Sequence, residues 1–361
     1  MSSEIGLSKF KNIGGVTCYM NSILAILQQT DIFCDYIISG KFKENLINNI
    51  NLSDIEESVI FQLHKLFSVS LSLENGVVTP TTLRKVCASK DNIYNRWGSQ
   101  EQQDSPDFLL FLLEKLIEEI GQKVTFIPGK INHSNQNIQN SFELLISTID
   151  YNKFLEKEFS PLTNLFNGLG HATTTCKVCR NKNSKFETFK VLEVEIPDET
   201  KDIDIFDCLD KWSESEELDD DNRYQCSFCG VKSNASRKHL IMKTPKILII
   251  HLKRFKKDMF GRILGKNNKK IGFPLYDLSI EKYISDSSKD KGKSNYNLFG
   301  VNCHYGIGQG QINFGHYISI VKNRYDNNWY NFNDSNNPQL IKKEEDIVNQ
   351  NSYILFYVRS N

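Results

Sequence analysis

Apolar residues recur every three or four positions through the first third of the chain. Four segments show this spacing, and each is predicted to form a helix: 18–30, 53–72, 80–90 and 104–121. In the last segment Pro106 suits a first helical turn, and Gly121 marks the end of the apolar pattern. The first third of the chain is therefore predicted to be helical.

The pattern changes after about residue 140, where apolar and polar residues begin to alternate. Residues 186–196 alternate as a half-buried strand does, and 245–252 form a β-branched apolar run that is typical of a buried strand. Four more segments are predicted to be strands: 296–303, 315–323, 328–333 and 352–358. Two polar segments, 211–223 and 285–295, are predicted to be solvated loops. Helices followed by mostly antiparallel strands indicate an α+β fold.

The composition of the 361 residues is that of a soluble globular protein, with 39% apolar and 24% charged residues. Lys plus Arg and Asp plus Glu are equal at 44 each, which argues against a general nucleic-acid or membrane surface. No segment approaches the ~18 apolar residues that span a bilayer, and the N-terminal residues lack the apolar core of a signal peptide. We therefore expect an intracellular protein, in the cytoplasm, the nucleus or both, that binds neither nucleic acid nor membranes.

Four of the nine cysteines form two Cys-x-x-Cys pairs, Cys176 with Cys179 and Cys226 with Cys229. In a reducing compartment such pairs indicate metal ligands sooner than disulfides. The spacing is that of a tetrahedral zinc site, and four thiolates leave no open position for a water, so we predict one structural zinc ion. Free thiols are the competing interpretation, and His171 is an alternative ligand.

Cys18 stands directly before an amphipathic helical segment and follows Gly14 and Gly15. The unpaired N–H groups and the dipole of a helix N-terminus favour a thiolate, so the pKa of a cysteine in this position is expected to fall. Cys18 is therefore a candidate nucleophile. Packing is the competing interpretation, and for a lone cysteine beside a helix it is the commoner one.

A cysteine nucleophile needs a base, and the base needs a third group that holds its tautomer. Of the seven histidines, His316 follows a glycine and enters a predicted strand. A second strand follows closely, and antiparallel pairing of the two would bring Asn333 or Asp334 beside His316. His304 is the competing base, while His251 lies in an apolar run and is predicted to be a core residue.

Seven ordered motifs carry a family resemblance: GGVTCYMNS at 14–22, QQDSPDFLLFLLEKL at 102–116, CKVC at 176–179, YQCSFC at 224–229, KTPKILIIHLKRF at 243–255, GHYISIVK at 315–322 and WYNFNDS at 329–335. In this order they resemble the ubiquitin-specific proteases, which are papain-like cysteine deubiquitinases. The resemblance covers nearly the whole chain.

The resemblance implies a single catalytic domain, 1–361, shaped like a right hand. A helical thumb would take up about 1–130, β fingers with the zinc site 165–240, and an antiparallel β palm mainly 131–164 and 241–361. It further implies that ubiquitin and its conjugates are the partners, and that targeting or activating subunits direct the chain to its substrates.

The implied reaction is hydrolysis of the isopeptide or peptide bond after the C-terminal glycine of ubiquitin. By the family pattern Cys18 is the nucleophile, His316 the base and Asn333 the third member, with Asp334 as a second helper. The alternatives are a protease for another modifier such as SUMO, or a family member that binds ubiquitin and has weak activity.

Substrate-binding residues are also implied by the resemblance. Asp104 and Asp107 match family carboxylates that bind the arginine-rich tail of ubiquitin, and Tyr317 belongs to the same substrate-binding set. From the residues alone, the two acids are helix-capping charges.

One segment departs from the family pattern. The family usually has an asparagine five residues before the cysteine, where its amide stabilises the oxyanion. Here Ile13 fills that position, and Asn12 stands one residue earlier. Either a bulge at Gly14 and Gly15 returns Asn12 to the oxyanion hole, or the hole consists of backbone N–H groups. As a third interpretation, Asn12 is a turn residue.

Overall fold

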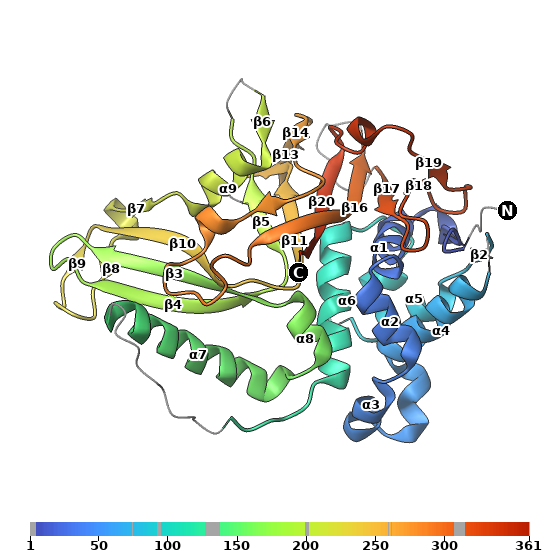
Figure 1. Cartoon of the computed structure of the whole chain (residues 1–361), viewed down its shortest axis with the longest axis horizontal. Helices are drawn as coiled ribbons and strands as arrows, with labels where there is room; N and C mark the ends of the chain where they lie inside the picture. Colours follow the sequence, from blue (N-terminus) through green and yellow to red (C-terminus); the bar gives the residue numbers. More distant parts are fainter. Residues whose placement is uncertain are drawn as a thin grey trace.

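The computed structural model describes residues 5–73, 75–91, 95–126, 138–198, 202–258, 260, 262–306 and 315–360. Figure 1 shows a group of helices, a central sheet beside them and a second sheet that extends away from both. The chain therefore has the α+β organisation that the sequence predicts. Among the described residues, no helix is long and apolar enough to cross a membrane.

The helical part, which we call the thumb, contains α1 (Cys18–Gln28), α2 (Asp31–Ser39), α3 (Lys43–Asn49), α4 (Val59–Ser72), α5 (Thr81–Ser89) and α6 (Ser105–Ile120). Its 3-10 turns are η1 (Ile13–Gly15), η2 (Leu52–Glu57) and η3 (Arg96–Gly98). Every residue of α1 is buried, because this helix lies between α6 and the central sheet. The four predicted helices are confirmed, except that the second begins only at Val59, after η2.

The central sheet, which we call the palm sheet, has the strand order β19-β18-β17-β16-β20-β11-β5, with β15 paired to β16. Its strands are β5 (Leu192–Glu195), β11 (Ile247–Lys253), β15 (Leu278–Ser279), β16 (Asn295–Tyr305), β17 (His316–Lys322), β18 (Trp329–Phe332), β19 (Gln339–Leu340) and β20 (Ser352–Arg359). Strand β5 runs parallel to β11, and the other neighbours are antiparallel. The strands predicted between residues 245 and 358 are confirmed.

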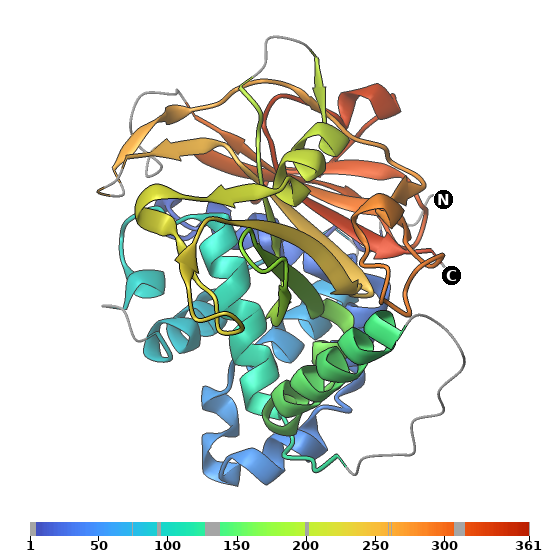
Figure 2. The same ribbon diagram turned by 90° about the vertical axis from the view of Figure 1, so that its left-hand side faces the viewer.

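Both faces of the palm sheet are covered, so its strands are apolar on both sides. Ile249 of β11 packs into the core that the sheet shares with the thumb helices. The neighbouring Ile250 points to the opposite face and packs with Leu209 of α9 (Ile205–Ser213). Figure 2 shows the palm sheet lying across the thumb helices. This contact brings α1 against β17, which is where the candidate site forms.

The second sheet, which we call the finger sheet, has the order β4-β3-β10-β7. Its strands are β3 (Gly168–Cys176), β4 (Lys182–Phe189), β7 (Glu216–Leu218) and β10 (Ala235–Lys243), and the hairpin of β8 (Tyr224–Gln225) and β9 (Lys232–Ser233) lies at its far end (Figure 1). The predicted strand at 186–196 is thus divided between β4 of the fingers and β5 of the palm.

Two expectations for the middle of the chain need correction. The range 131–164 is not mainly palm, because α7 (Ile138–Glu158) packs along the finger sheet and buries Tyr151 and Leu155 against β3 and β4; residues 131–137 lie outside the described residues. The range 211–223 is not a loop throughout, since it holds the end of α9, strand β7 and η4 (Asp220–Asn222). A capping box at Asp204 starts α9, and pairing with β10 orders β7.

Short elements complete the fold. Two-stranded ladders join β1 (Lys9–Phe10) to β2 (Val77–Val78), β6 (Ile203–Asp204) to β14 (Ile271–Gly272), and β12 (Phe255–Lys257) to β13 (Ile263–Lys266). The remaining helical pieces are α8 (Pro161–Phe166), η5 (Glu281–Tyr283) and η6 (Glu344–Asp346).

Candidate active site and metal centre

Cys18 is the first residue of α1, and the loop before it is shaped by two glycines. Gly14 and Gly15 have φ values of 65° and 76°, a region that glycine enters without steric cost. Asn12 Oδ1 accepts hydrogen bonds from the backbone N–H of Thr17 at 2.8 Å and from its hydroxyl at 3.2 Å. The loop is therefore closed on itself, and Asn12 lies beside the residue that precedes Cys18.

The thiol of Cys18 is shielded from water, with 1% of the residue exposed. Burial raises the pKa of Cys18 to about 11; a hydrogen bond from the backbone of Tyr317 opposes this rise, and the charge of Asp334 adds to it. The expected fall of the pKa at the helix N-terminus is therefore wrong for this structure, because desolvation outweighs the helix dipole. The raised pKa favours the thiol form of Cys18 in the free protein.

His316 begins β17, and Asn333 follows the end of β18 in the same antiparallel hairpin. His316 Nε2 and Asn333 Oδ1 lie 2.7 Å apart. With Oδ1 as the acceptor, Nε2 carries the hydrogen and Nδ1 keeps the lone pair that a general base needs. No hydrogen bond joins His316 to Cys18 within the described residues. Proton transfer between them therefore needs a small movement of a side chain, as is common in free enzymes.

Asp334 connects the histidine hairpin to the cysteine loop. Its Oδ2 accepts a hydrogen bond from Asn12 Nδ2 at 2.9 Å, and its Oδ1 accepts one from Asn21 Nδ2 at 2.7 Å. The same Oδ2 lies 3.9 Å from His316 Nε2. The carboxylate is thus fixed by two amides from the thumb and stands just behind the Asn333–His316 pair.

Asn21 did not emerge from the sequence analysis. It stands three residues after Cys18, so both side chains lie on the same face of α1. This helical spacing is the signal that could have identified it.

The competing histidine, His304, lies in β16 and pairs across the sheet with Tyr317. It is 1% exposed, and neither of its ring nitrogens has a hydrogen-bond partner within the described residues. Burial, together with the positive charges of Lys266 and His316, lowers the pKa of His304 to about 3. His304 is therefore a neutral buried residue, and His316 has the contacts of a base.

Asp104 and Asp107 lie at the start of α6, in the wall of a cavity of about 640 Å³. Asp104 is the N-cap residue, but its side chain caps nothing. Instead its two oxygens accept hydrogen bonds from the hydroxyls of Tyr317 at 2.6 Å and Tyr353 at 3.1 Å. Burial raises the pKa of Asp104, and the Tyr317 hydrogen bond opposes the rise. Two tyrosines thus hold one carboxylate at the cavity wall.

Tyr317 is not itself part of the cavity wall. It is 2% exposed, and its hydroxyl is used by Asp104. Its side chain therefore supports Asp104, and its substrate-binding role stays a prediction.

Three further carboxylates line the same cavity: Glu193, Glu195 and Asp198. The alternation in β5 places Glu193 and Glu195 on one face of the strand, and this period of two is the signal that could have identified them. His251 also lines the cavity, 3.7 Å from Glu193, so its interpretation as a satisfied core residue is wrong. Four cations line the same cavity too: Lys211, Lys253, Arg254 and Lys256. Lys211 and Lys253 pair with Glu195, and Lys256 pairs with Asp198. The carboxylates of Asp104, Asp107 and Glu193 suit a basic, extended ligand, and we call this space the acidic cavity.

The four paired cysteines come together at the far end of the finger sheet. Their sulfur atoms all lie within 4.8 Å of one another, and the group could hold a metal ion. In each pair the carbonyl oxygen of the first cysteine accepts a hydrogen bond from a backbone N–H four residues later. Arg180 N–H donates to Cys176 O at 3.0 Å, and Gly230 N–H donates to Cys226 O at 2.9 Å. Both donors have a positive φ, which closes each pair into a tight turn.

The alternative ligand, His171, lies elsewhere. Its ring stacks on Phe186, and its two nitrogens lie 3.0 Å from Ser285 Oγ and 2.9 Å from Ser184 Oγ. His171 is therefore a residue of the finger sheet and is not in the cysteine cluster.

Comparison with known sequences decides the family. The sequence model described as ubiquitin carboxyl-terminal hydrolase matches residues 8–357. The chain belongs to the ubiquitin carboxyl-terminal hydrolase family. The match includes every residue of the candidate site and the cysteine cluster.

Curated members of the ubiquitin carboxyl-terminal hydrolase family align along most of the chain. Ubiquitin carboxyl-terminal hydrolase 4 of Eremothecium gossypii is 27% identical over 369 residues, which cover 96% of this chain and 42% of the relative. Ubiquitin carboxyl-terminal hydrolase 2 of Homo sapiens is 28% identical, with 98% of this chain and 55% of the relative covered. The chain thus spans about half the length of these relatives.

Solved structures share the fold of the hydrolase family. The structure described as the SAGA Ubp8/Sgf11/Sus1/Sgf73 DUB module bound to ubiquitin aldehyde matches with a TM-score of 0.71 and 23% identity, covering all of this chain and 71% of that one. A second structure of this SAGA DUB module, bound to monoubiquitin, matches with a TM-score of 0.70 and 22% identity over the same shares of the two chains. The thumb, palm and finger arrangement of the present chain is therefore that of the family.

Proposed function

We propose that this chain is a thiol-dependent deubiquitinase, which hydrolyses the isopeptide or peptide bond after the C-terminal glycine of ubiquitin. The observation that carries the proposal is the 2.7 Å contact of His316 Nε2 with Asn333 Oδ1, in a hairpin packed against the helix that begins with Cys18. This is a nucleophile, a base and an orienting group from three separate segments, as covalent acyl transfer requires.

In the proposed reaction, His316 Nδ1 takes the proton of Cys18, and the thiolate attacks the carbonyl carbon of the last glycine. The C–N bond breaks as His316 returns the proton to the departing amine. Water, deprotonated by His316, then attacks the thioester, releases the ubiquitin carboxylate and restores the thiol. Because burial raises the pKa of Cys18, alignment of the imidazole with the thiol would favour formation of the thiolate.

We assign the acidic cavity to the C-terminal tail of ubiquitin, which is arginine-rich. Asp104 and Asp107 at the start of α6 share the wall of this cavity with Glu193 and Glu195 of β5. Guanidinium groups form strong paired hydrogen bonds with carboxylates. Tyr317 and Tyr353 would contribute by holding Asp104, because each donates a hydrogen bond to it.

For Asn12 we propose two roles. One hydrogen of its Nδ2 fixes Asp334. The second has no acceptor among the described residues and would help the backbone N–H groups near Cys18 to stabilise the oxyanion. The positive φ values of Gly14 and Gly15 support the view that the extra residue of this loop is accommodated there, so that Asn12 still reaches the site.

We propose that the cysteine cluster holds one structural zinc ion. Four sulfur ligands at ~2.3 Å from a tetrahedral zinc stand about 3.8 Å apart. The contacts of Cys176 with Cys229 at 4.0 Å and of Cys179 with Cys226 at 3.7 Å fit that geometry. The ion would join the turn between β3 and β4 to the turn between β8 and β9, and it has no part in the chemical steps.

We further propose that residues 1–361 act as one catalytic domain inside the cell, in the cytoplasm or the nucleus, where free thiols persist. Targeting or activating subunits are proposed as partners, since a solved neighbour is described as a module of Ubp8 with Sgf11, Sus1 and Sgf73.

The test is hydrolysis of a panel of modifiers, each carrying a C-terminal fluorogenic amide. Ubiquitin should be cleaved at least tenfold faster than SUMO and other modifiers, and Cys18→Ser should abolish cleavage. If another modifier were cleaved faster, that modifier and not ubiquitin would be the substrate. Tight binding of ubiquitin without cleavage would indicate a ubiquitin-binding protein.

A further inference from the structure

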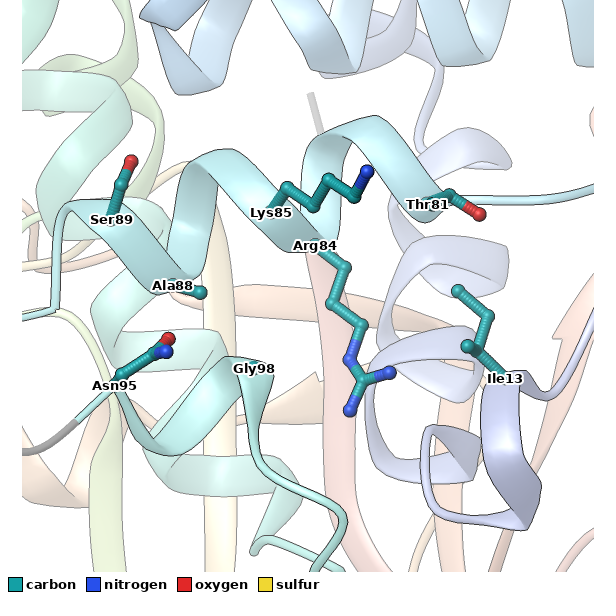
Figure 3. A pocket seen from close by; sticks show the side chains of 8 residues that line it. All are labelled: Ile13, Thr81, Arg84, Lys85, Ala88, Ser89, Asn95 and Gly98. Atoms are coloured by element: carbon teal, nitrogen blue, oxygen red, sulfur yellow. The ribbon is translucent and has the colours of Figure 1, made fainter.

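A second cavity lies in the thumb, away from the acidic cavity, and has a volume of about 650 Å³. One wall is α5, from which Thr81, Arg84, Lys85, Ala88 and Ser89 contribute. The other side is formed by Asn95, Gly98 of η3 and Ile13 of η1 (Figure 3). We call this cavity the α5 groove.

The α5 groove is elongated. The five residues of its helical wall follow the spacing i, i+3, i+4, i+7 and i+8, which is one face of α5 over two turns. Eight residue steps at 1.5 Å each give a wall of roughly 12 Å. An extended peptide advances about 3.3 Å per residue, so about four residues would lie along it.

The charge of the groove is uniformly positive. Among the described residues that line it, Arg84 and Lys85 are cationic and none is a carboxylate. Lys85 is exposed and forms no ion pair within the described residues, while Ile13, Ala88 and the aliphatic parts of the two cations supply apolar surface. The groove therefore favours a ligand that combines a negative charge with apolar groups.

Arg84 is the most informative residue of the groove. It is 7% exposed, and Figure 3 shows it extending from α5 into the space between Gly98 and Ile13. Its Nε donates to Trp97 O at 2.9 Å and its Nη2 to Ser99 O at 2.5 Å. Among the described residues, Nη1 has no hydrogen-bond partner and no carboxylate pairs with the guanidinium. Nη1 is not one of the buried atoms without a partner, so it is open to a ligand in the groove. A guanidinium held by two backbone carbonyls keeps its positive charge, which favours an anionic ligand.

From these observations we infer that the α5 groove binds a short extended segment of a partner protein in which an aspartate or glutamate is flanked by apolar side chains. The carboxylate would bind Arg84 Nη1 and Lys85, and the flanking side chains would cover Ile13 and Ala88. The groove lies outside the acidic cavity and uses none of its residues, so this binding is separate from the proposed recognition of the ubiquitin tail.

The test is an array of fluorescein-labelled pentapeptides, each with Asp or Glu at the centre and Leu, Ile, Val, Phe or Met at the other positions. Binding to the whole chain is measured by fluorescence polarisation in about 0.1 M salt. A second array carries Asn or Gln at the centre. We expect the best acidic peptides to bind at least tenfold more tightly than their amide counterparts.

Two variants locate the binding. Lys85→Glu should weaken binding of the best acidic peptide at least tenfold. Lys90→Glu makes the same charge change at the C-cap of α5, outside the groove lining, and should alter binding by less than twofold. The melting temperature of each variant is recorded to verify folding. Equal binding of acidic and amide arrays, equal effects of the two variants, or complete displacement by 10 mM inorganic phosphate would overturn the inference.

Discussion

The hydrogen bond between His316 and Asn333 leads to a quantitative prediction. Asn333→Ala removes the acceptor that lies 2.7 Å from His316 Nε2 and leaves the rest of the hairpin unchanged. The imidazole gains a positive charge when it takes the thiol proton, so the lost interaction is one with a charged group. Such hydrogen bonds contribute about 1.5–3 kcal/mol, which corresponds to a rate loss of about 10- to 150-fold.

Asp334 limits this loss. Its Oδ2 lies 3.9 Å from His316 Nε2, close enough to interact with an imidazolium, but both of its oxygens are held by Asn12 and Asn21. Asn333→Ala should therefore retain partial activity, and the double variant Asn333→Ala/Asp334→Ala should lose at least tenfold more. Asn333→Asp keeps an acceptor at the same place and should stay within about fivefold of the original chain.

The assay is steady-state hydrolysis of ubiquitin with a C-terminal fluorogenic amide. The loss should appear in kcat with little change in KM, because Asn333 does not line the acidic cavity. Asn336→Ala, on the exposed loop that follows, is the matched control and should be neutral. A kcat within threefold of the original chain for Asn333→Ala, or an equal loss in Asn336→Ala, would refute this role of Asn333.

Three other predictions test the thiol, the acidic cavity and the metal centre. Alkylation of Cys18 by iodoacetamide in the free protein, followed by mass spectrometry, should keep accelerating up to about pH 11, because burial raises its pKa; a plateau near pH 7 would contradict this. Asp104→Asn should raise KM for the ubiquitin substrate at least tenfold, and Tyr317→Phe should raise it less, since Tyr353 still holds the carboxylate; an unchanged KM in Asp104→Asn would contradict the tail assignment. Cys226→Ser should lower the melting temperature by several degrees and reduce bound zinc measured by mass spectrometry, whereas Cys208→Ser, outside the cluster, should keep the zinc; equal zinc in both variants would exclude the proposed site.

Periodicity predicted the elements whose apolar pattern matches their burial. The helix at 104–121 and the strand at 245–252 are apolar where they contact the core, so their sequences indicate both type and position. Helix α7 contains good helix formers such as Glu, Leu and Lys, but its apolar residues follow the helical period less clearly than those of α6, so the sequence pattern did not predict it. Its position depends on the packing of Tyr151 and Leu155 against the finger sheet, a contact that no local pattern contains.

In the candidate site, too, contacts between distant segments are not visible in local sequence patterns. Asn333 could be expected near His316 because a short hairpin joins them. The link from Asp334 to Asn12 and Asn21 joins positions more than 300 residues apart, and only the packing of α1 on β17 brings them together. The pKa of Cys18 differs from the expectation for a similar reason: helix position is visible in the sequence, whereas burial is a property of the folded chain.

The proposed function depends on Cys18 acting as a nucleophile toward the C-terminus of ubiquitin. The most direct measurement is labelling of the folded chain by ubiquitin that carries a C-terminal electrophile, followed by mass spectrometry of the intact protein and its peptides. We expect one ubiquitin per chain, attached at Cys18, with no adduct in Cys18→Ser and an unchanged adduct in Cys34→Ser. An absence of adduct, or an adduct that persists in Cys18→Ser, would contradict this proposal.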